Sequence, residues 1–277
     1  MIDKLEMFLA VAKERHFGRA AESLGITQPT LSAGIKQLEE QLGVLLIFRG
    51  SRYGGLTPEG QSALVWARRI VGDTRQLREE MRATRHGLSG QLRIAVIPTA
   101  LTWAARISAR FGAAHPNVGM TILSRTSVEI LQMIDDLQVD AGISYLDNEP
   151  LGRVSTVRLY DERYMLVCGL DSPLARRDRV TWGDLAGHRM CLLTSDMQNR
   201  RIVTRHLVEA GADAMPRVES TSMLAILSHV ATGDWAAILP RSLARGLPLP
   251  QGVSARDLSG EGHMVGLVTA RREPHPP

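Results

Sequence analysis

The sequence predicts an α/β protein in three parts: a helical N-terminal region, one long helix, and a C-terminal half in which strands and helices alternate. Three observations support this prediction. Two short helical patterns flank a tight turn at residues 25–27. An apolar stripe then continues at helical spacing over residues 58–85. From Gln91 onward, short apolar runs typical of strands alternate with amphipathic stretches typical of helices.

The N-terminal region is predicted to hold three helices. Residues 3–14 and 18–24 form the first two, because small and apolar residues recur there at helical spacing. Thr27 can cap a third helix with its side-chain oxygen, and Pro29 falls in the first turn of that helix, where a missing N–H costs nothing. We expect the buried stripe of the third helix to consist of Leu31, Ile35, Leu38 and Leu42.

The opposite face of this third helix carries small and polar residues. A helix, a short turn and a second helix can place the second helix in the major groove of DNA. Small polar side chains at the start of that helix suit base edges, and Lys36 suits a phosphate. A three-helix bundle that binds nothing is the alternative. The residues expected to approach DNA are Gln28, Pro29, Thr30, Ser32, Ala33 and Lys36.

The segment from Gly43 to Pro58 favours the DNA-binding interpretation. It contains no acidic residue, and it places Arg49 and Arg52 in a stretch rich in glycine and serine. A basic loop that follows a recognition helix can grip the sugar-phosphate backbone as a wing. A surface hairpin whose two arginines have no such role is the alternative.

This N-terminal order closely resembles the winged helix-turn-helix of LysR-type transcriptional regulators. The shared elements are AA-x-x-L, Q-P-x-L-S-x-x-I-x-x-L-E, L-G-V and L-T-x-x-G, all in register between Ala20 and Gly60. The resemblance implies DNA contacts from the third helix and from the two wing arginines. One departure concerns Ala33, because the family often has an arginine directly after the Leu-Ser pair. Alanine cannot make a bidentate contact to guanine, so the usual base preference is not assumed.

Residues from Pro58 to about Arg85 are predicted to form one long helix. A helix of about 27 residues spans roughly 40 Å, which a small domain cannot cover alone. We expect its apolar stripe to pair with a second copy of the chain, and a solvated spacer is the alternative. The resemblance implies the same role, since LysR-type proteins dimerise through this helix. The stripe consists of Leu64, Ala67, Ile70, Val71, Leu77 and Met81.

The C-terminal half follows a predicted hinge. Its alternating strands and helices indicate a mostly parallel sheet with right-handed crossovers. Strands are expected at residues 92–97, 118–124 and 140–145, with helices at about 102–111 and 127–137. A second set of alternating elements is expected at 163–169, 189–193, 200–209, 218–221, 222–232 and 236–240, and a strand at 263–270 returns to the first set. Two such sets, which the chain crosses near Asp161 and near His263, resemble the periplasmic-binding-protein-like sensor of LysR-type regulators. The predicted domains are 1–58 for DNA binding, 59–86 for the linker and dimerisation helix, 87–90 for the hinge and 91–277 for effector binding, with lobe I at about 91–161 and 264–277 and lobe II at about 162–263.

A ligand of such a fold is expected between the lobes, at the carboxyl ends of the strands. Four loops there carry hydroxyl groups into helix N-termini, which bind anions, and nearby arginines would favour a small carboxylate or another oxyanion. Each hydroxyl alone is equally well explained as an ordinary helix cap, and which arginine faces the ligand is left open. The candidate effector-binding residues are Thr99, Ala100, Thr102, Arg125, Thr126, Ser127, Thr194, Asn199, Arg200, Arg201, Thr221 and Ser222.

Composition limits the possible function classes. The chain has 277 residues and a formal net charge of +4, of which +3 lies in residues 1–90, where it suits an anionic partner. The eight histidines show no paired metal-ligand spacing, and Cys168 and Cys191 are expected to be buried, reduced thiols. No metal, cofactor or catalytic group is therefore predicted. Neither a signal peptide nor a run of about 18 apolar residues is recognised, so we expect a cytoplasmic protein that does not span a membrane.

The function predicted from these parts is ligand-responsive regulation of transcription. Its partners would be double-stranded promoter or operator DNA, a small effector, further copies of the chain in a dimer or tetramer, and RNA polymerase. One alternative is a solute-binding receptor or an enzyme built on residues 91–277, and another is an architectural DNA binder without a ligand. No secretion signal supports the receptor, and no nucleophile with its base supports the enzyme. The segments YLDNEPLGRV and SDMQNRR further resemble regulators found beside formate dehydrogenase genes.

Overall fold

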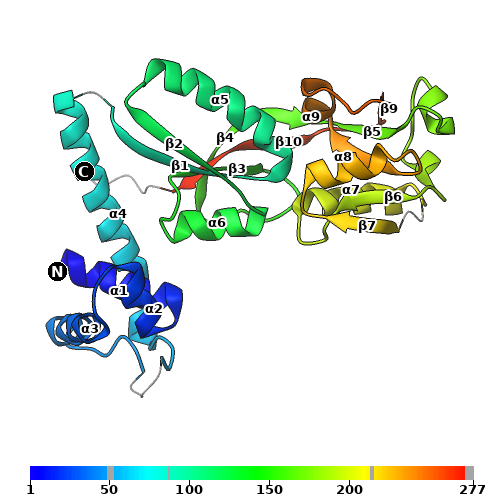
Figure 1. The fold of residues 1–277 in the computed structure, drawn as a ribbon. Coiled ribbons are helices and arrows are strands. Elements are labelled where there is room, and N and C mark those ends of the chain that lie inside the picture. Colours follow the sequence, from blue (N-terminus) through cyan, green and yellow to red (C-terminus); the bar gives the residue numbers. More distant parts are fainter. Residues whose placement is uncertain (49–52, 87, 213–214, 272–277) are drawn as a thin grey trace. The chain divides into compact units, whose positions relative to one another are not determined.

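The computed structural model describes residues 1–48, 53–86, 88–212 and 215–271 (Figure 1). The chain divides into two compact units, of which the first comprises Met1–Ser89 with Asp135–Leu137 and the second comprises Gly90–Ile134 with Gln138–Pro277. In the described part of the chain, the first unit is helical apart from one β-bridge, and both β-sheets belong to the second unit. None of the helices in these ranges is long and apolar enough to cross a membrane.

The first unit packs three short helices against the beginning of a long one. The helices are α1 (Ile2–Glu14), α2 (Phe17–Ser23), α3 (Gln28–Leu42) and α4 (Pro58–His86). Their common core contains Phe8 and Val11 of α1, Ala20 and Ala21 of α2, and Leu31, Ile35 and Leu38 of α3. The buried stripe predicted for α3 is thus confirmed at these three positions. It is wrong at Leu42, which is 43 % exposed because α3 ends there and the chain turns away through Gly43.

The long helix α4 uses its apolar residues in two ways. Ala67 and Val71 are buried in the core of the first unit. Other apolar side chains of α4 are exposed in the single chain, which leaves a face that another molecule can cover. These exposed residues are Val65, Trp66, Ile70, Leu77 and Met81.

Lobe I of the second unit is built on a five-stranded sheet with the order β2-β1-β3-β10-β4. Its strands are β1 (Gly90–Val96), β2 (Val118–Ser124), β3 (Ala141–Tyr145), β4 (Val154–Glu162) and β10 (His263–Ala270). The helices α5 (Leu101–Ala114) and α6 (Ser127–Asp135) lie on opposite sides of this sheet (Figure 1). The first three strands are mutually parallel as predicted, whereas β10 runs antiparallel to both β3 and β4.

Lobe II repeats this plan with a five-stranded sheet in the order β7-β6-β8-β5-β9. Its strands are β5 (Tyr164–Gly169), β6 (Met190–Leu193), β7 (Pro216–Ser220), β8 (Ala236–Pro240) and β9 (Val253–Asp257), and its helices are α7 (Gln198–Glu209), α8 (Met223–Val230) and α9 (Arg241–Gly246). The chain crosses between the lobes at Arg163 and again between Asp257 and His263, close to the two predicted points. Because each crossing strand enters from the other lobe, both sheets are mixed and not mostly parallel.

The second unit has two apolar clusters. One extends through both lobes, since it contains Ile143 and Tyr145 of lobe I together with Tyr164 and Leu166 of lobe II. The other fills the remaining face of the second sheet, against residues of α8 and α9. Neighbouring residues of β5 and β6 therefore point to opposite faces of that sheet.

Candidate functional site

The turn between α2 and α3 is fixed by local contacts. Gly25 takes a positive φ of 66°, a conformation that favours glycine, and the Ile26 amide donates to the Ala21 carbonyl at 3.0 Å. Thr27 caps α3 as predicted, because its side-chain oxygen accepts from the Thr30 amide at 3.4 Å. The start of α3 is thus held at a defined angle to α2.

All the residues of α3 that were predicted to approach DNA are exposed. Lys36 is the most informative, because the ion pair that it forms with Glu40 is long, at 3.7 Å, and both side chains are largely in solvent. Such an exposed pair is weak, so the ammonium group remains able to bind a phosphate. The exposed set comprises Gln28, Pro29, Thr30, Ser32, Ala33 and Lys36.

The base of the wing is tied to both neighbouring helices. The Glu39 carboxylate on α3 accepts from the Leu46 amide at 2.7 Å and from the Ile47 amide at 3.2 Å. An antiparallel bridge joins Ile47 to Leu56, on the two sides of the wing segment. Thr57 Oγ1 donates to the Leu45 carbonyl and accepts from the Gly60 amide at the start of α4.

Some of the predicted DNA contacts cannot be placed. Arg49 and Arg52 lie outside the described residues. Sequence reasoning did not single out Glu39, although its position four residues after Ile35 puts it beside the buried stripe, where it can reach the loop that follows α3.

The second unit contains a narrow pocket between its lobes. The pocket has an empty volume of about 200 Å³. It is lined by residues that follow β1, by the starts of α6 and α7, and by the last residues of β3 and β6. The lining residues are Ile97, Pro98, Thr99, Thr126, Ser127, Tyr145, Leu193, Met197, Gln198 and Asn199.

Four of the twelve predicted effector-binding residues line this pocket: Thr99, Thr126, Ser127 and Asn199. Ser127 is 4 % exposed, and its hydroxyl has no hydrogen-bond partner within the described ranges. A buried, unpaired hydroxyl is costly, so a ligand or water that bonded to it would be favoured. The remaining eight, which do not line the pocket, are Ala100, Thr102, Arg125, Thr194, Arg200, Arg201, Thr221 and Ser222.

The three predicted arginines are engaged elsewhere. Arg125 donates to the Ser124 carbonyl at 2.7 Å, and Arg200 pairs with Glu219 at 3.2 Å. Arg201 forms a bidentate pair with Glu149 at 2.6 and 2.8 Å. Among the predicted hydroxyls, that of Ser222 accepts from the Ala225 amide and so caps α8. This helix cap is the alternative role that the sequence analysis allowed for each hydroxyl.

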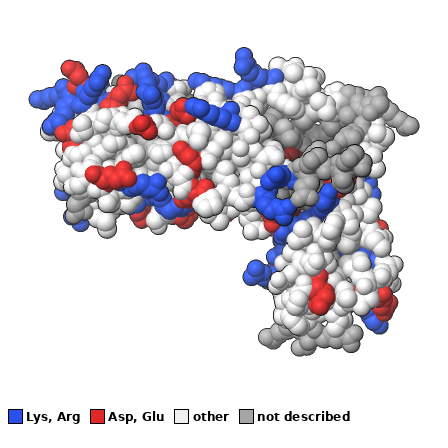
Figure 2. Space-filling view, turned by 180° about the vertical axis from the view of Figure 1, so that it is seen from behind, with Lys and Arg blue, Asp and Glu red and all other residues white. Residues whose placement is uncertain are grey.

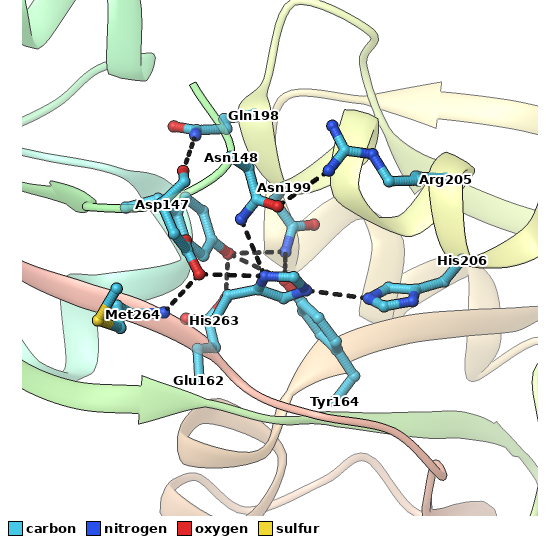
Figure 3. A network of polar contacts seen from close by, with 11 residues as sticks. Asp147, Asn148, Glu162, Tyr164, Gln198, Asn199, Arg205, His206, His263 and Met264 are labelled. Carbon is cyan, nitrogen blue, oxygen red and sulfur yellow. Dashed lines mark hydrogen bonds and ion pairs between the residues drawn. The ribbon is translucent and has the colours of Figure 1, made fainter. Parts of the chain in front are cut away.

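Polar contacts join the lobes beside the pocket (Figure 3). From α7, Gln198 Nε2 donates to the Asp147 carbonyl at 3.1 Å, and Arg205 donates to Asn148 Oδ1 at 3.0 Å. His206 Nε2 lies 2.9 Å from His263 Nε2, at the second crossing. These contacts bind α7 to lobe I both at its first residue and near its last turn.

A buried carboxyl group lies behind the pocket at the first crossing. Glu162 is 1 % exposed, and its two oxygens accept from the hydroxyls of Tyr145 and Tyr160. Burial raises the pKa of Glu162 to about 7, although hydrogen bonds from its neighbours pull the pKa the other way. Burial also raises the pKa of Tyr145 well above its ordinary value, so the phenol is protonated at neutral pH.

Sequence reasoning missed Glu162, Tyr145 and Gln198. Tyr145 was placed in a strand but not at the pocket, although the end of a parallel strand is where ligands are expected. The sequence does not indicate that Glu162 is buried, because a single acidic residue at the end of a largely exposed strand is usually a surface residue.

The second unit has nearly balanced charge. Residues 91–277 hold 20 Lys and Arg against 19 Asp and Glu. On the face seen in Figure 2, side chains of both signs are interspersed over this unit. Most of the net positive charge, which suits a phosphate backbone, therefore lies in residues 1–90.

Comparison with known proteins agrees with both halves of this description. Residues 2–61 match the family model of bacterial regulatory helix-turn-helix proteins of the lysR family, and residues 85–277 match that of the LysR substrate binding domain. The hydrogen peroxide-inducible genes activator of Dickeya chrysanthemi is 32 % identical over 240 residues, which cover 86 % of this chain and 78 % of the relative. The DNA-binding transcriptional dual regulator OxyR of Escherichia coli is similar to the same extent, at 32 % identity with the same coverage.

Solved structures share the fold along the whole chain. A full-length OxyR variant from Pseudomonas aeruginosa is 26 % identical, with a TM-score of 0.77 over 98 % of this chain and 89 % of that one. Full-length CbnR in complex with its target DNA has a TM-score of 0.62 at 20 % identity, over 99 % of this chain and 94 % of that one, which shows the fold alone. The chain therefore belongs to the LysR family of DNA-binding transcriptional regulators with an effector-binding domain.

Proposed function

We propose that this regulator reads DNA by placing the start of α3 in the major groove. The observation that carries the proposal is the division of α3 into two faces. Leu31, Ile35 and Leu38 hold the helix in the core, while the residues from Gln28 to Lys36 that point away are all exposed. In this proposal Gln28, Pro29, Thr30, Ser32 and Ala33 face base edges and Lys36 binds a phosphate. Arg49 and Arg52 on the wing would contact the backbone nearby.

We propose the same functional division that the sequence suggested. Residues 1–58 bind DNA, 59–86 dimerise, 87–90 act as a hinge, and 91–277 bind the effector, with lobe I at about 91–161 and 264–277 and lobe II at about 162–263. The exposed apolar side chains of α4 support the dimerising role, since a second copy would remove them from water. In a dimer or a tetramer, two copies of α3 would then bind the two halves of a two-fold symmetric DNA site. RNA polymerase would be the further partner through which bound DNA affects transcription.

We propose that the pocket between the lobes is the effector site. Its support is the unpaired hydroxyl of Ser127, together with Thr99, Thr126 and Asn199 on the pocket wall. An effector that bound one arrangement of the lobes more tightly would shift the population toward that arrangement. The sequence favoured an anion because of three arginines, but Arg125, Arg200 and Arg201 contact other groups. Among the described residues that line the pocket, the starts of α6 and α7 are left to attract a negative charge.

Oxidation of thiols is a second candidate signal, because two of the relatives are named for hydrogen peroxide or as OxyR. Cys168 belongs to the apolar cluster on one face of the second sheet and Cys191 to the cluster on the other face. Both thiols are buried, and burial raises the pKa of each, which disfavours the reactive thiolate. A disulfide between opposite faces of a sheet would require the sheet to open. We therefore propose a bound effector as the signal and assign no catalytic activity to the chain.

Replacement of one α3 side chain tests the DNA-binding proposal. The full-length protein would be titrated onto a palindromic fragment selected from random DNA, at several salt concentrations. Lys36→Ala is expected to weaken binding about tenfold and to reduce the slope of log affinity against log salt by about one per half-site. Lys13→Ala, which removes the same charge from an exposed site on α1, serves as the control. Equal affinities of the Lys36 variant and the parent protein would remove Lys36 from the interface.

A further inference from the structure

A chain of hydrogen bonds joins the two lobes beside the second crossing (Figure 3). Arg205 on α7 donates to Asn148 Oδ1 at 3.0 Å. The amide nitrogen of Asn148 lies 2.9 Å from His263 Nδ1, and His263 Nε2 lies 2.9 Å from His206 Nε2. Asn148 follows β3 and His263 begins β10, so lobe I supplies the middle of the chain and α7 of lobe II supplies both ends.

The arginine fixes the direction of every hydrogen bond in this chain. A guanidinium only donates, so Asn148 accepts through Oδ1 and its Nδ2 donates to His263 Nδ1. His263 Nδ1 is then unprotonated, and the neutral ring carries its proton on Nε2, which donates to His206 Nε2. His206 in turn keeps its proton on Nδ1, on the side of Glu209. The chain is therefore complete only when both imidazoles are neutral.

An added proton breaks the chain at either ring. On His206 it would occupy Nε2 and point at the Nε2 proton of His263 across 2.9 Å. On His263 it would occupy Nδ1 and point at the amide protons of Asn148. An acceptor for it there is Asp147 Oδ2, at 3.4 Å, which would replace Asn148 as the partner. Since two donors cannot bond to each other, one link between the lobes is lost in either case.

The surroundings of the two rings allow them to titrate. Both rings are partly exposed, so protons from solvent can reach them. Burial lowers the pKa of His206 from its ordinary value, and the neighbouring His263 lowers it further, so His206 is neutral at neutral pH. The charged and titratable groups that face the rings are Arg205 and Glu209 on α7, Asp147 after β3, Glu162 on β4 and Tyr164 on β5.

We infer that this chain of four residues is a proton-sensitive latch between the lobes, which is closed while both imidazoles are neutral and opens when either is protonated. Opening releases the last turns of α7 from lobe I. The start of α7 stays attached, because Gln198 donates to the Asp147 carbonyl and Arg201 pairs with Glu149. Acid would thus shift the arrangement of the lobes whether or not the pocket binds an effector.

Energy transfer between two dyes would measure the opening. The dyes are attached to cysteines introduced at Val128 of α6 and Leu224 of α8, which are exposed, whereas both native thiols are buried. Labelled full-length protein is diluted with unlabelled protein, so that each assembly holds one labelled copy. We expect a single narrow distribution of transfer efficiency at pH 7.5. A second population should grow by up to about tenfold for each unit of pH below about 6.5. The same distribution from pH 7.5 to pH 5 would overturn the inference.

Paired substitutions locate the response. His206→Gln combined with His263→Gln removes both titrating rings and is expected to make the distribution independent of pH. His115→Gln combined with His188→Gln is the matched control, because these residues precede β2 and β6, at the ends of the sheets opposite to the pocket. The control should respond to acid as the parent does. A response that survived in the first pair would contradict the latch.

Asn148→Gly tests the middle of the chain and stands in if the glutamine pair does not fold. Asn148 has a φ of 70°, which glycine adopts without strain. Loss of its amide cuts the link from Arg205 to His263, so the second population should be about tenfold larger than in the parent at pH 7.5. Glu162→Gln should keep the parent response, since that carboxyl is bonded outside the chain. Parent-like behaviour of Asn148→Gly, or loss of the response in Glu162→Gln, would refute the inference.

Discussion

Ionisation of the buried Glu162 carboxyl lowers the free energy of unfolding of the protein. Its pKa is about 7 in the folded protein because of burial, against an ordinary value of 4.5. Between these values the folded state holds a proton that the unfolded state has lost, so stability falls as pH rises through this range and levels off above it. One pKa unit is worth about 1.4 kcal/mol, so the fall is about 3 kcal/mol.

We predict that Glu162→Gln removes this fall, because an amide has no charge to desolvate. The free energy of unfolding would be measured with urea at intervals from pH 5 to pH 8 for the parent and the variant. The pKa of His206 is lowered by burial, which makes stability fall as pH drops below the ordinary histidine value, but His206 is present in both proteins. The difference between the two curves therefore isolates Glu162. If the difference in unfolding free energy between the two proteins stayed constant from pH 5 to pH 8, Glu162 would not change its protonation state in this range, and the prediction would be wrong.

At the scale of elements, the start of α4 depends on a close approach between backbone segments. A Cβ atom built on Gly60 would lie 2.0 Å from the Leu46 carbonyl oxygen at the base of the wing. We predict that Gly60→Ala destabilises the first unit by about 2 kcal/mol or more and weakens DNA binding, because the wing must shift. Thermal unfolding and DNA titration would measure both effects.

Gly112 provides the matched control for this prediction. It also lies in a helix, α5, and a Cβ there would meet no atom within 4 Å. Gly112→Ala is expected to stabilise the protein by about 0.5–1 kcal/mol, since alanine is the better helix former. If both substitutions had the same effect, the contact between Gly60 and the wing would not be the cause.

Most elements could be predicted from the sequence, because their residues repeat with a clear period. The strands Val118–Ser124, Ala236–Pro240 and His263–Ala270 have the predicted bounds, and α3 begins after the predicted cap Thr27. The strands β4 and β9 were missed. The outer part of β4 is largely exposed, so its polar residues do not show the apolar run that marks a buried strand.

The pocket was less predictable than the fold. The rule that ligands lie at strand ends found the loops that bear Thr99, Thr126, Ser127 and Asn199. The same rule does not show which side chain of a loop points into the pocket, so Arg200 and Arg201 were predicted as effector-binding residues together with Asn199. Those directions depend on partners distant in the sequence, such as Glu219 and Glu149. The two-residue shift in the start of α7, from Arg200 to Gln198, also hid the contribution of Gln198.

At the scale of the whole molecule, we propose that the exposed face of α4 links DNA binding to assembly. Trp66 is 59 % exposed and Val65 is 65 % exposed, and both lie on the long helix outside the core of the first unit. In the proposed function, where the regulator reads a two-fold site, a second copy of the chain would cover this face. Each copy would then contribute one α3, and the two contacts would reinforce each other.

We predict that Trp66→Glu converts the assembly into monomers without unfolding them, because the side chain contributes little to the core of its own chain. Light scattering would report the mass, and circular dichroism the fold. Affinity for a full palindrome should fall by about a hundredfold, toward the affinity of a single half-site, since linked binding is lost. Leu247→Glu, at an exposed apolar position of the second unit, should change neither quantity. A Trp66 variant that kept the parent mass at micromolar concentration would show that α4 is not the surface through which the copies associate.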